Sequence, residues 1–306
     1  MRPTLTREAH VGTPGRLDAV LAELTGLPRA DVQRAIAAGR VTVDGEPRAK
    51  SFRLTGGEAL VIELPDDAEL EPEDPPVPVR YRDDDLLVIA KPPGLVTHPT
   101  ENRRSGTLVN RLLGMGEPLS TTGGPLRPGI VHRLDAGTSG LMVVARDDRA
   151  HEALAAMLKD HAIERRYLAL VRGEVEHEAF AVDAPLGRRA DKVVVDHTEG
   201  RPAETAFEVR ERFDGLTLLE AIPKTGRTHQ IRVHLQAIGH PIVGDKAYGG
   251  GGDAAKRLGL QRPFLHSWKI AFDQPFTGAR IELEEPLPED LEAALGLARA
   301  QTIDRA

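Results

Sequence analysis

Residues 131–140 (VHRLDAGTSG) place polar side chains and two glycines immediately before a run of apolar residues. A loop held against a rigid strand is a common place for a reactive group to be displayed. Asp135 is the only carboxylate of this loop, which makes it the first candidate for catalysis. A structural role stays open, in which Asp135 caps a turn or pairs with Arg133.

Residues 224–234 (KTGRTHQIRVH) form a second candidate segment, with three cationic side chains around a glycine and an expected helix start. These side chains are Lys224, Arg227 and Arg232. A helix N-terminus with arginines nearby is suited to bind an anion, either a phosphate or a catalytic carboxylate. The alternative is a basic face that is merely solvated.

Other kinds of chemistry find little support in the sequence. Ser139 lacks the G-x-S-x-G spacing of a hydrolase nucleophile. His229 and His234 are five residues apart, so they do not share a helix face, and the chain has neither a His-Glu-x-x-His motif nor any cysteine. Phosphate-binding and dinucleotide-binding glycine motifs are also missing, so we expect no metal and no cofactor.

The elements that must position these segments follow from hydrophobic patterning. Continuous apolar runs predict buried strands, and apolar residues at helical spacing predict amphipathic helices. Strands are expected at 86–90, 141–145, 167–171 and 216–222, and helices at 150–160 and 229–238. Because strands and helices alternate without a regular rhythm, the fold class expected is α+β with a mixed, largely antiparallel sheet.

The chain divides at an acidic, proline-rich segment, residues 65–76, which predicts a linker. Before it, residues 14–64 predict a small α/β module of two short helices and short strands. After it, residues 77–290 are long enough for a catalytic domain. Residues 1–13 and 291–306 are expected to be tails.

The charge distribution permits a nucleic-acid partner. The chain has 47 acidic and 40 basic residues, giving a net charge of −7, but the acids concentrate in residues 66–74 and 282–306. The remainder is mildly basic, as RNA binding requires. No apolar run is long enough to span a membrane. The first residues lack the apolar core of a secretion signal, so a cytoplasmic location is expected.

The motifs together resemble the RluA/RluD family of pseudouridine synthases. The segment HRLD at 132–135 with TSGL at 138–141 is similar to the family signature. The family's other motifs are matched in order by KPPGL at 91–95, RYLALV at 166–171 and GRTHQIRVH at 226–234. The resemblance extends over roughly residues 77–285, and residues 14–64 resemble the S4-type RNA-binding module of many RluD-like members.

This resemblance implies isomerisation of uridine to pseudouridine within RNA, by an aspartate and without a cofactor. Asp135 stands at the position of the catalytic aspartate, where it attacks the ribose or takes a proton from it. Arg227 is the expected partner that keeps Asp135 ionised. Tyr167 corresponds to the family tyrosine that packs against the uracil, although a core tyrosine in a strand would look the same.

Further residues are expected to contact RNA. Arg133 is two residues from Asp135 and can fill the gap left by a flipped base, or pair with Asp135 instead. The other expected substrate-binding residues are His132, Lys224, Ile231 and Arg232. The phosphate contacts expected in the S4-like module are Arg16, Arg29, Arg34 and Arg40.

The expected partner is structured RNA, with large-subunit ribosomal RNA favoured over transfer RNA. No membrane partner is expected, and nothing in the sequence suggests a coiled coil, which favours a monomer. The competing function is a non-catalytic RNA-binding protein with a decayed synthase domain. The presence of Asp135, Tyr167 and Arg227 together argues against it.

Overall fold

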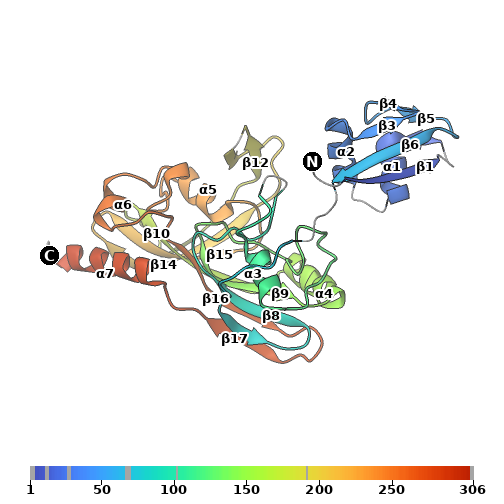
Figure 1. Cartoon of the computed structure of the whole chain (residues 1–306). Helices are drawn as coiled ribbons and strands as arrows, with labels where there is room; N and C mark the ends of the chain where they lie inside the picture. The colour runs from blue at the N-terminus through green and yellow to red at the C-terminus, as the bar shows by residue number, and fades with distance from the viewer. Residues whose placement is uncertain are drawn as a thin grey trace. The chain divides into compact units, whose positions relative to one another are not determined.

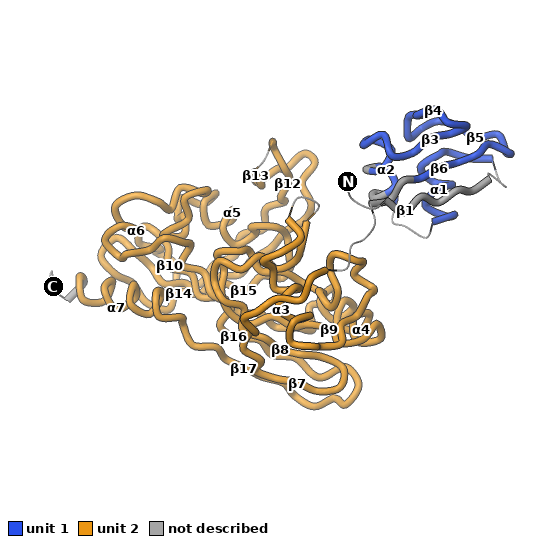
Figure 2. The backbone as a smooth tube through the Cα atoms, viewed as in Figure 1, with its two compact units in different colours: residues 1–69 blue, residues 70–306 orange. Residues whose placement is uncertain are grey.

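The computed structural model describes residues 4–10, 14–25, 29–65, 70–100, 103–190 and 192–303 of the 306-residue chain. They belong to two units, Met1–Glu69 and Leu70–Ala306, which are coloured separately in Figure 2. Within the described ranges, no helix is long and apolar enough to cross a membrane.

Unit 1 is a small sheet with two short helices. Its strands are β1 (Thr4–His10), β2 (Gly15–Arg16), β3 (Val41–Val43), β4 (Glu46–Pro47), β5 (Arg53–Leu54) and β6 (Ala59–Pro65), and its helices are α1 (Leu17–Thr25) and α2 (Arg29–Ala37). The main sheet has the order β1-β6-β3-β4, while β2 pairs with β5. Leu17 and Leu21 of α1 share one buried core with Val41 and Ile62 of the sheet.

The start of the chain differs from the expected tail at residues 1–13. Thr4–His10 forms β1, which pairs antiparallel with β6 in a register that runs from Thr4 beside Pro65 to His10 beside Ala59. The partner strand lies far along the sequence, so the local pattern could not reveal the pairing. Residues 1–3 and 11–13 lie outside the described ranges.

Unit 2 is built on one large sheet (Figure 1). Its strands are β7 (Val79–Arg82), β8 (Leu86–Lys91), β9 (Ser139–Ala145), β10 (Glu164–Arg172), β11 (Ala179–Asp183), β14 (Glu204–Phe213), β15 (Leu216–Pro223), β16 (Leu265–Asp273) and β17 (Arg280–Glu284). The nine strands run in the order β11-β14-β15-β10-β16-β9-β8-β7, with β17 beside β16. The pairs are antiparallel except for β9 and β16, so the predicted α+β class with a largely antiparallel sheet is confirmed.

Strand β16 joins the two halves of this sheet. It pairs with β10 on one side and with β9 on the other, although it follows both in the chain. Its parallel contact with β9 places His266 beside Ser139 and Ser267 beside Gly140. The end of the loop that carries Asp135 is therefore tied to the middle of the sheet.

Strands β8 and β9 are buried on both faces, as their continuous apolar sequences predict. Helix α4 (Asp148–Lys159) packs on one face, where Ala150 and Leu154 join a core with Val88 and Val143. Helix α3 (Leu108–Gly114) packs on the other, where Leu108 joins a core with Ile89, Met142 and Val144. The strands provide a rigid base for the loop between α3 and β9.

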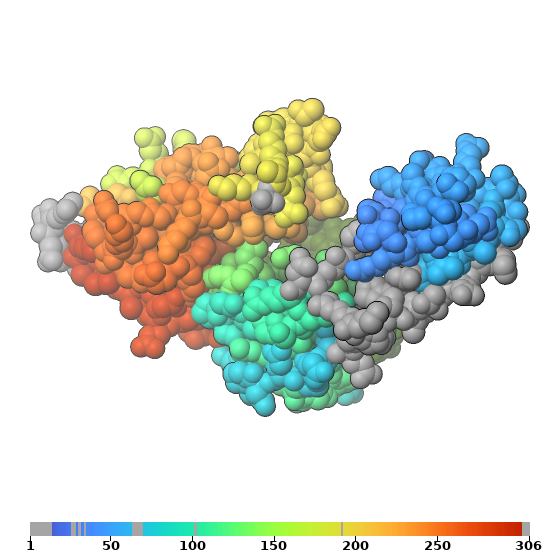
Figure 3. Space-filling view, turned by 45° about the horizontal axis from the view of Figure 1, so that its top comes forward, coloured from blue at the N-terminus to red at the C-terminus, as the bar shows by residue number. Residues whose placement is uncertain are grey.

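Smaller elements surround the sheet. The paired strands β12 (Leu186–Arg189) and β13 (Lys192–Val195) project from the body of unit 2, as the ribbon and the space-filling view both show (Figures 1 and 3). Helix α5 (Gln230–Ala237), the 3-10 turn η1 (Lys246–Tyr248) and helix α6 (Asp253–Arg257) follow β15. The helix expected at 229–238 is thus present as α5.

Part of the expected linker at 65–76 is anchored to unit 2, and residues 291–303 of the expected tail are helical. Pro65 ends β6, and the Glu73 carboxylate accepts hydrogen bonds of 2.9 Å from the Gly106 amide within unit 2. Residues 66–69 lie outside the described ranges.

The C-terminal segment forms helix α7 (Glu289–Ile303), which packs beside β14. It buries Leu291, Ala294, Leu295 and Ala298 in the main core of unit 2. These positions follow the spacing of one helix face. Two of the four are alanines, so the apolar pattern was weak beside the many acids of this segment.

The buried face of α7 predicts a difference between two leucines of one helix. Leu291 is fully buried, whereas Leu297 is 45% exposed. Leu291→Ala should lower the free energy of unfolding by about 2–5 kcal/mol, because it leaves a cavity in the core. Leu297→Ala should change it by less than about 0.5 kcal/mol. Urea unfolding of both variants provides the measurement, and equal effects would contradict the docking of α7.

Candidate active site

The loop before β9 presents Asp135 at the edge of a cavity. The Thr138 amide donates a 3.0 Å hydrogen bond to the Asp135 carbonyl, which closes a turn around the aspartate. The Asp135 side chain is 18% exposed. It is therefore accessible to a ligand while its backbone is held by the turn and by β9.

Arg232 holds the Asp135 carboxylate. Its Nη1 donates to Asp135 Oδ2 at 2.9 Å, while its Nε and Nη2 donate to the two oxygens of Asp245 at 2.6 and 2.9 Å. Burial lowers the pKa of Arg232, but the hydrogen bonds and charges of Asp245 and Asp135 outweigh burial and raise it. The guanidinium therefore stays charged between two carboxylates.

The structure contradicts the expected pairing of Arg227 with Asp135. Arg227 Nε donates instead to the Pro202 carbonyl at 3.1 Å. The physical reason is the start of α5. Arg232 lies in the first turn of that helix and faces the Asp135 loop, whereas Arg227 lies in the preceding turn, where its amide is bound by Gln230 Oε1 at 3.0 Å.

His229 is part of the site, although it was not among the catalytic or substrate-binding residues expected from the sequence. It precedes α5 with a left-handed backbone (φ 56°), which few non-glycine residues adopt. Its Nδ1 lies 2.8 Å from the Tyr248 hydroxyl and its Nε2 lies 3.8 Å from Asp135 Oδ1. Burial lowers the pKa of His229, and the Asp135 charge opposes that shift. Only the three-dimensional turn brings the ring to Asp135.

Tyr167 and Ile231 form an apolar part of the same cavity. Tyr167 comes from β10 and is 6% exposed, and Ile231 of α5 is 7% exposed. Burial raises the pKa of Tyr167, so its phenol stays neutral at physiological pH. Both side chains lie where a flat apolar ligand can pack.

His132 lies deeper beside them. Its Nε2 accepts a 3.0 Å hydrogen bond from the Val143 amide, which leaves Nδ1 to carry the proton. Burial, with a smaller effect of the Arg165 charge, lowers the pKa of His132 to about 3. The ring is therefore neutral and joins the loop to β9.

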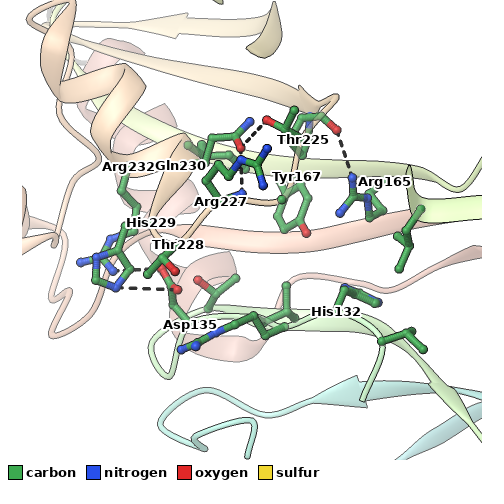
Figure 4. A pocket seen from close by; sticks show the side chains of 18 of the residues that line it. His132, Asp135, Arg165, Tyr167, Thr225, Arg227, Thr228, His229, Gln230 and Arg232 are labelled. Carbon is green, nitrogen blue, oxygen red and sulfur yellow. Dashed lines mark hydrogen bonds and ion pairs between the residues drawn. The ribbon is translucent and has the colours of Figure 1, made fainter. Parts of the chain in front are cut away.

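The cavity that these residues line has a volume of about 370 Å³, in the range of small-ligand sites. Figure 4 shows Asp135, His229 and Arg232 toward one end, and Tyr167, His132 and Arg165 toward the other. Among the described residues that line it, Asp135 is the one carboxylate, and the lysine and arginine side chains are Arg127, Arg133, Lys159, Arg165, Arg227 and Arg232. Such a lining suits a polyanion such as RNA.

Of two residues expected to bind substrate, Arg133 lines the cavity and Lys224 does not. Arg133 is exposed and lines the cavity, and it forms no ion pair with Asp135 within the described part of the chain. Lys224 does not line the cavity. Its ammonium pairs with Glu204 of the neighbouring strand β14, which turns it away from Asp135. The prediction that Lys224 binds substrate is therefore not supported by its position.

Comparison with known proteins gives this site its context. The family model for RNA pseudouridylate synthases matches residues 85–237, and the model for the S4 domain matches residues 15–60. YlyB of Bacillus subtilis, described as an uncharacterized RNA pseudouridine synthase, is 40% identical over 269 residues, or 86% of this chain and 87% of that protein. The chain belongs to the RNA pseudouridylate synthase family.

Other similar proteins are also named as pseudouridine synthases. Ribosomal large subunit pseudouridine synthase D of Nitrosomonas europaea is 40% identical over 93% of this chain and 84% of that protein. The solved structure of human RNA pseudouridylate synthase domain containing 1 has a TM-score of 0.57 at 27% identity and covers 73% of this chain and 90% of that one. The resemblance to the RluA/RluD family with an S4 module is thus confirmed.

Lys91 clamps one side of the Asp135 loop of the synthase. Its side chain is 1% exposed, and its ammonium donates to the carbonyls of Pro92, Leu95 and Ala136 at 2.9, 2.9 and 3.3 Å. Burial lowers the pKa of Lys91 to about 7, against the effect of the Asp135 charge. The contact to Ala136 fixes the backbone next to Asp135.

Arg262 clamps the other side. Its Nη1 donates to the Gly137 carbonyl at 3.0 Å and to Ser139 Oγ at 3.3 Å, and its other nitrogens form an ion pair with Asp290 of α7. Because Ser139 Oγ accepts from Arg262, its proton goes to His266 Nδ1 at 2.9 Å. His266 Nε2 then donates to the Glu285 carbonyl at 3.0 Å. Ser139 is 2% exposed, so its hydroxyl is held between Arg262 and His266 and is not open to a substrate.

In the S4 domain of the synthase, two of the four arginines expected to contact RNA already pair with a carboxylate. Arg16 and Arg29 pair with the buried Asp18 at 3.1 and 3.0 Å. Their hydrogen bonds, led by that of Arg16, lower the pKa of Asp18. Arg40 is exposed, whereas the side chain of Arg34 lies outside the described part.

The burial of His132 predicts a change in acid stability. The unfolded state takes up a proton near the ordinary pKa of 6.5, whereas the folded state does so only near 3, so wild-type stability falls as the pH drops through this window. His132→Gln retains an acceptor near Nε2 but does not titrate. We expect it to lose less stability than wild type between pH 6.5 and 3. Urea midpoints across this range provide the measurement.

The matched control is His177→Gln, because His177 is exposed. The urea midpoint of this variant should fall with decreasing pH as that of wild type does. If the urea midpoint of His132→Gln falls with decreasing pH as much as that of wild type, the ring is not held neutral by burial.

Proposed function

We propose that this synthase isomerises specific uridines of large-subunit ribosomal RNA to pseudouridine, with Asp135 as the catalytic group and no cofactor. The observation that carries the proposal is the Asp135 carboxylate, held by Arg232 inside a cavity with a cationic lining. Two relatives, from Nitrosomonas europaea and Zymomonas mobilis, are named ribosomal large subunit pseudouridine synthase D, at 40% and 38% identity. Their names support the choice of RNA.

The reaction is an isomerisation whose atoms balance without a redox partner. The N1–C1′ bond of uridine breaks, the uracil rotates, and a C5–C1′ bond forms. C5 loses its proton and N1 gains one, so no electrons are exchanged with another molecule. The work left to the protein is to bind the base outside its stack, to stabilise the ribose while the bond is broken, and to move these protons.

The two oxygens of Asp135 have different surroundings. Oδ2 accepts from Arg232 at 2.9 Å, while Oδ1 faces His229 at 3.8 Å, beyond hydrogen-bond distance. Oδ1 is therefore the oxygen offered to the ribose, either to attack C1′ or to take a proton from C2′. In both cases Arg232 favours the charged carboxylate, which the phosphates of bound RNA would otherwise disfavour.

Tyr167 packs against the uracil in this proposal and moves the proton at C5. Burial raises its pKa and keeps the phenol neutral, so Tyr167 acts as a relay that gives up its own hydroxyl proton as it receives the one from C5. Ile231 closes the apolar part of the cavity.

The target uridine must leave its stack to reach Asp135. In this proposal Arg133, which is exposed and lines the cavity, occupies the vacated position, since a planar guanidinium stacks on bases and binds phosphate. In the S4 unit, the exposed Arg40 is the better phosphate contact, since Arg16 and Arg29 are engaged by Asp18.

Asp135→Asn tests the catalytic role. The change keeps the shape but removes the charge, so turnover should fall at least about 100-fold, while RNA affinity stays within a few-fold. The measurement is tritium release from large-subunit ribosomal RNA labelled at uridine C5, with transfer RNA for comparison. Residual turnover above about 1% would refute the role of Asp135. Binding by wild type without tritium release from either RNA would instead indicate an RNA-binding protein.

A second test compares the two arginines of the KTGRTHQIR segment. Arg232→Ala should reduce turnover at least about 100-fold, because it leaves Asp135 without its charged partner. Arg227→Ala should reduce it less than about fivefold, because Arg227 binds a backbone carbonyl. Arg232→Lys should recover only part of the activity, since lysine keeps the charge but cannot bridge two carboxylates in the same plane. Single-turnover rates decide the comparison, with thermal unfolding showing that each variant is folded.

A further inference from the structure

Two adjacent arginines of β10 have opposite environments. Arg166 lies among carboxylates and forms ion pairs with Glu164 and with the fully buried Glu220. Arg165 points to the other face of the strand, is only 7% exposed, and lines the cavity of Asp135. The strand thus holds one arginine that is 30% exposed among carboxylates and one that is buried in the wall of the ligand cavity.

Arg165 has few partners for a buried guanidinium. No carboxylate lies within 4 Å of it in the described part of the chain. Its Nη2 donates one long hydrogen bond, 3.4 Å, to the Pro223 carbonyl, and its Nε has none. A buried charge without a partner destabilises the folded state. A ligand that accepts hydrogen bonds from Arg165 would recover much of that cost.

The neighbours of Arg165 show which part of a ligand it would meet. Its charge opposes the effect of burial on the pKa of Tyr167 and adds to the effect of burial on His132, so it lies close to both rings. A methyl group built on Gly226 would stand 3.5 Å from Nη1, which places that nitrogen beside the cavity wall. Figure 4 shows Arg165 beside Tyr167, away from Asp135.

This placement separates the two ends of a bound uridine. If the ribose lies at Asp135 and the uracil packs on Tyr167, as the proposed function requires, Arg165 meets the far edge of the base. Uracil presents carbonyl oxygens there, whereas cytosine presents an amino group at C4, which cannot accept from a guanidinium. We propose that Arg165 donates to O4 of the target uracil and thereby selects uracil over cytosine, which keeps O2 but has no acceptor at C4.

The rotation of the base gives this contact a second use. Turning uracil by half a turn about the line through N3 and C6 exchanges C5 with N1 and O2 with O4. The acceptor at Arg165 is therefore replaced by an equivalent one. The same guanidinium holds the base before the N1–C1′ bond breaks and after the C5–C1′ bond forms.

The inference rests on the proposed function, and a substrate–variant cycle tests it. Target uridines in the RNA are replaced by 2-thiouridine or 4-thiouridine, because sulfur accepts hydrogen bonds more weakly than oxygen. In wild type each replacement should slow the single-turnover rate about tenfold. In Arg165→Met the uridine rate itself should fall, but sulfur should cost less than about twofold, because the donor is gone. Arg166→Met, on the opposite face, should keep the wild-type sensitivity to sulfur.

Stability gives an independent readout. Arg165→Met removes a poorly paired buried charge, so its unfolding midpoint should equal or exceed that of wild type. Arg166→Met leaves the buried Glu220 with one arginine fewer, so its midpoint should fall. A structural role for Arg165 would instead lower the midpoint of Arg165→Met, which would overturn the proposal.

Two other results would also overturn it. Equal sulfur effects in wild type and Arg165→Met would show that Arg165 does not touch the base. If, in addition, the salt dependence of binding fell by about 0.7–0.9 in log–log slope, Arg165 would be a phosphate contact. Failure of wild type to release tritium from uridine C5 would count against the proposed function, and it is seen before any Arg165 variant is compared.

Discussion

The bridge from Asp135 through Arg232 to Asp245 is the interaction on which the site depends. Asp245 is itself fixed, since its Oδ1 accepts from the amides of Ala247 and Tyr248 at 3.2 and 3.3 Å. The guanidinium therefore transmits the position of η1 to the loop before β9, and α5 supplies the arginine that does so. The loop before β9 is far in sequence from α5 and η1, which follow one another closely, and the sheet on which these segments pack brings them together.

Three basic side chains bind the loop that carries Asp135 and act as its clamps. Lys91 binds the Ala136 carbonyl and Arg262 binds the Gly137 carbonyl, while Arg232 binds the Asp135 side chain. Burial lowers the pKa of Lys91 to about 7 while the Asp135 charge opposes that shift, so the carboxylate favours the charged form of this clamp. Of the three clamps, Arg232 also lines the cavity, where its charge adds to the cationic lining.

The sequence was sufficient where structure follows from local patterning. The apolar runs at 86–90 and 141–145 gave β8 and β9, and the helical spacing after Thr228 gave α5. The sequence was insufficient where a contact between distant parts of the chain determines the local structure. Whether Arg227 or Arg232 reaches Asp135 depends on the residue at which α5 begins, and His229 enters the site through one left-handed backbone angle. Strand β1 and helix α7 gain their structure from partners distant in the chain.

The position of β16 in the sheet also constrains the order in which the molecule can be assembled. During synthesis, β7 to β9 and then β10, β11, β14 and β15 leave the ribosome before residue 265. The two groups of strands meet only through β16, so neither can be joined to the other until this late strand has been made. Closing a sheet through such distant residues is a slow kind of folding step. The Asp135 loop, whose end pairs with β16, therefore takes its final form only in a nearly complete chain.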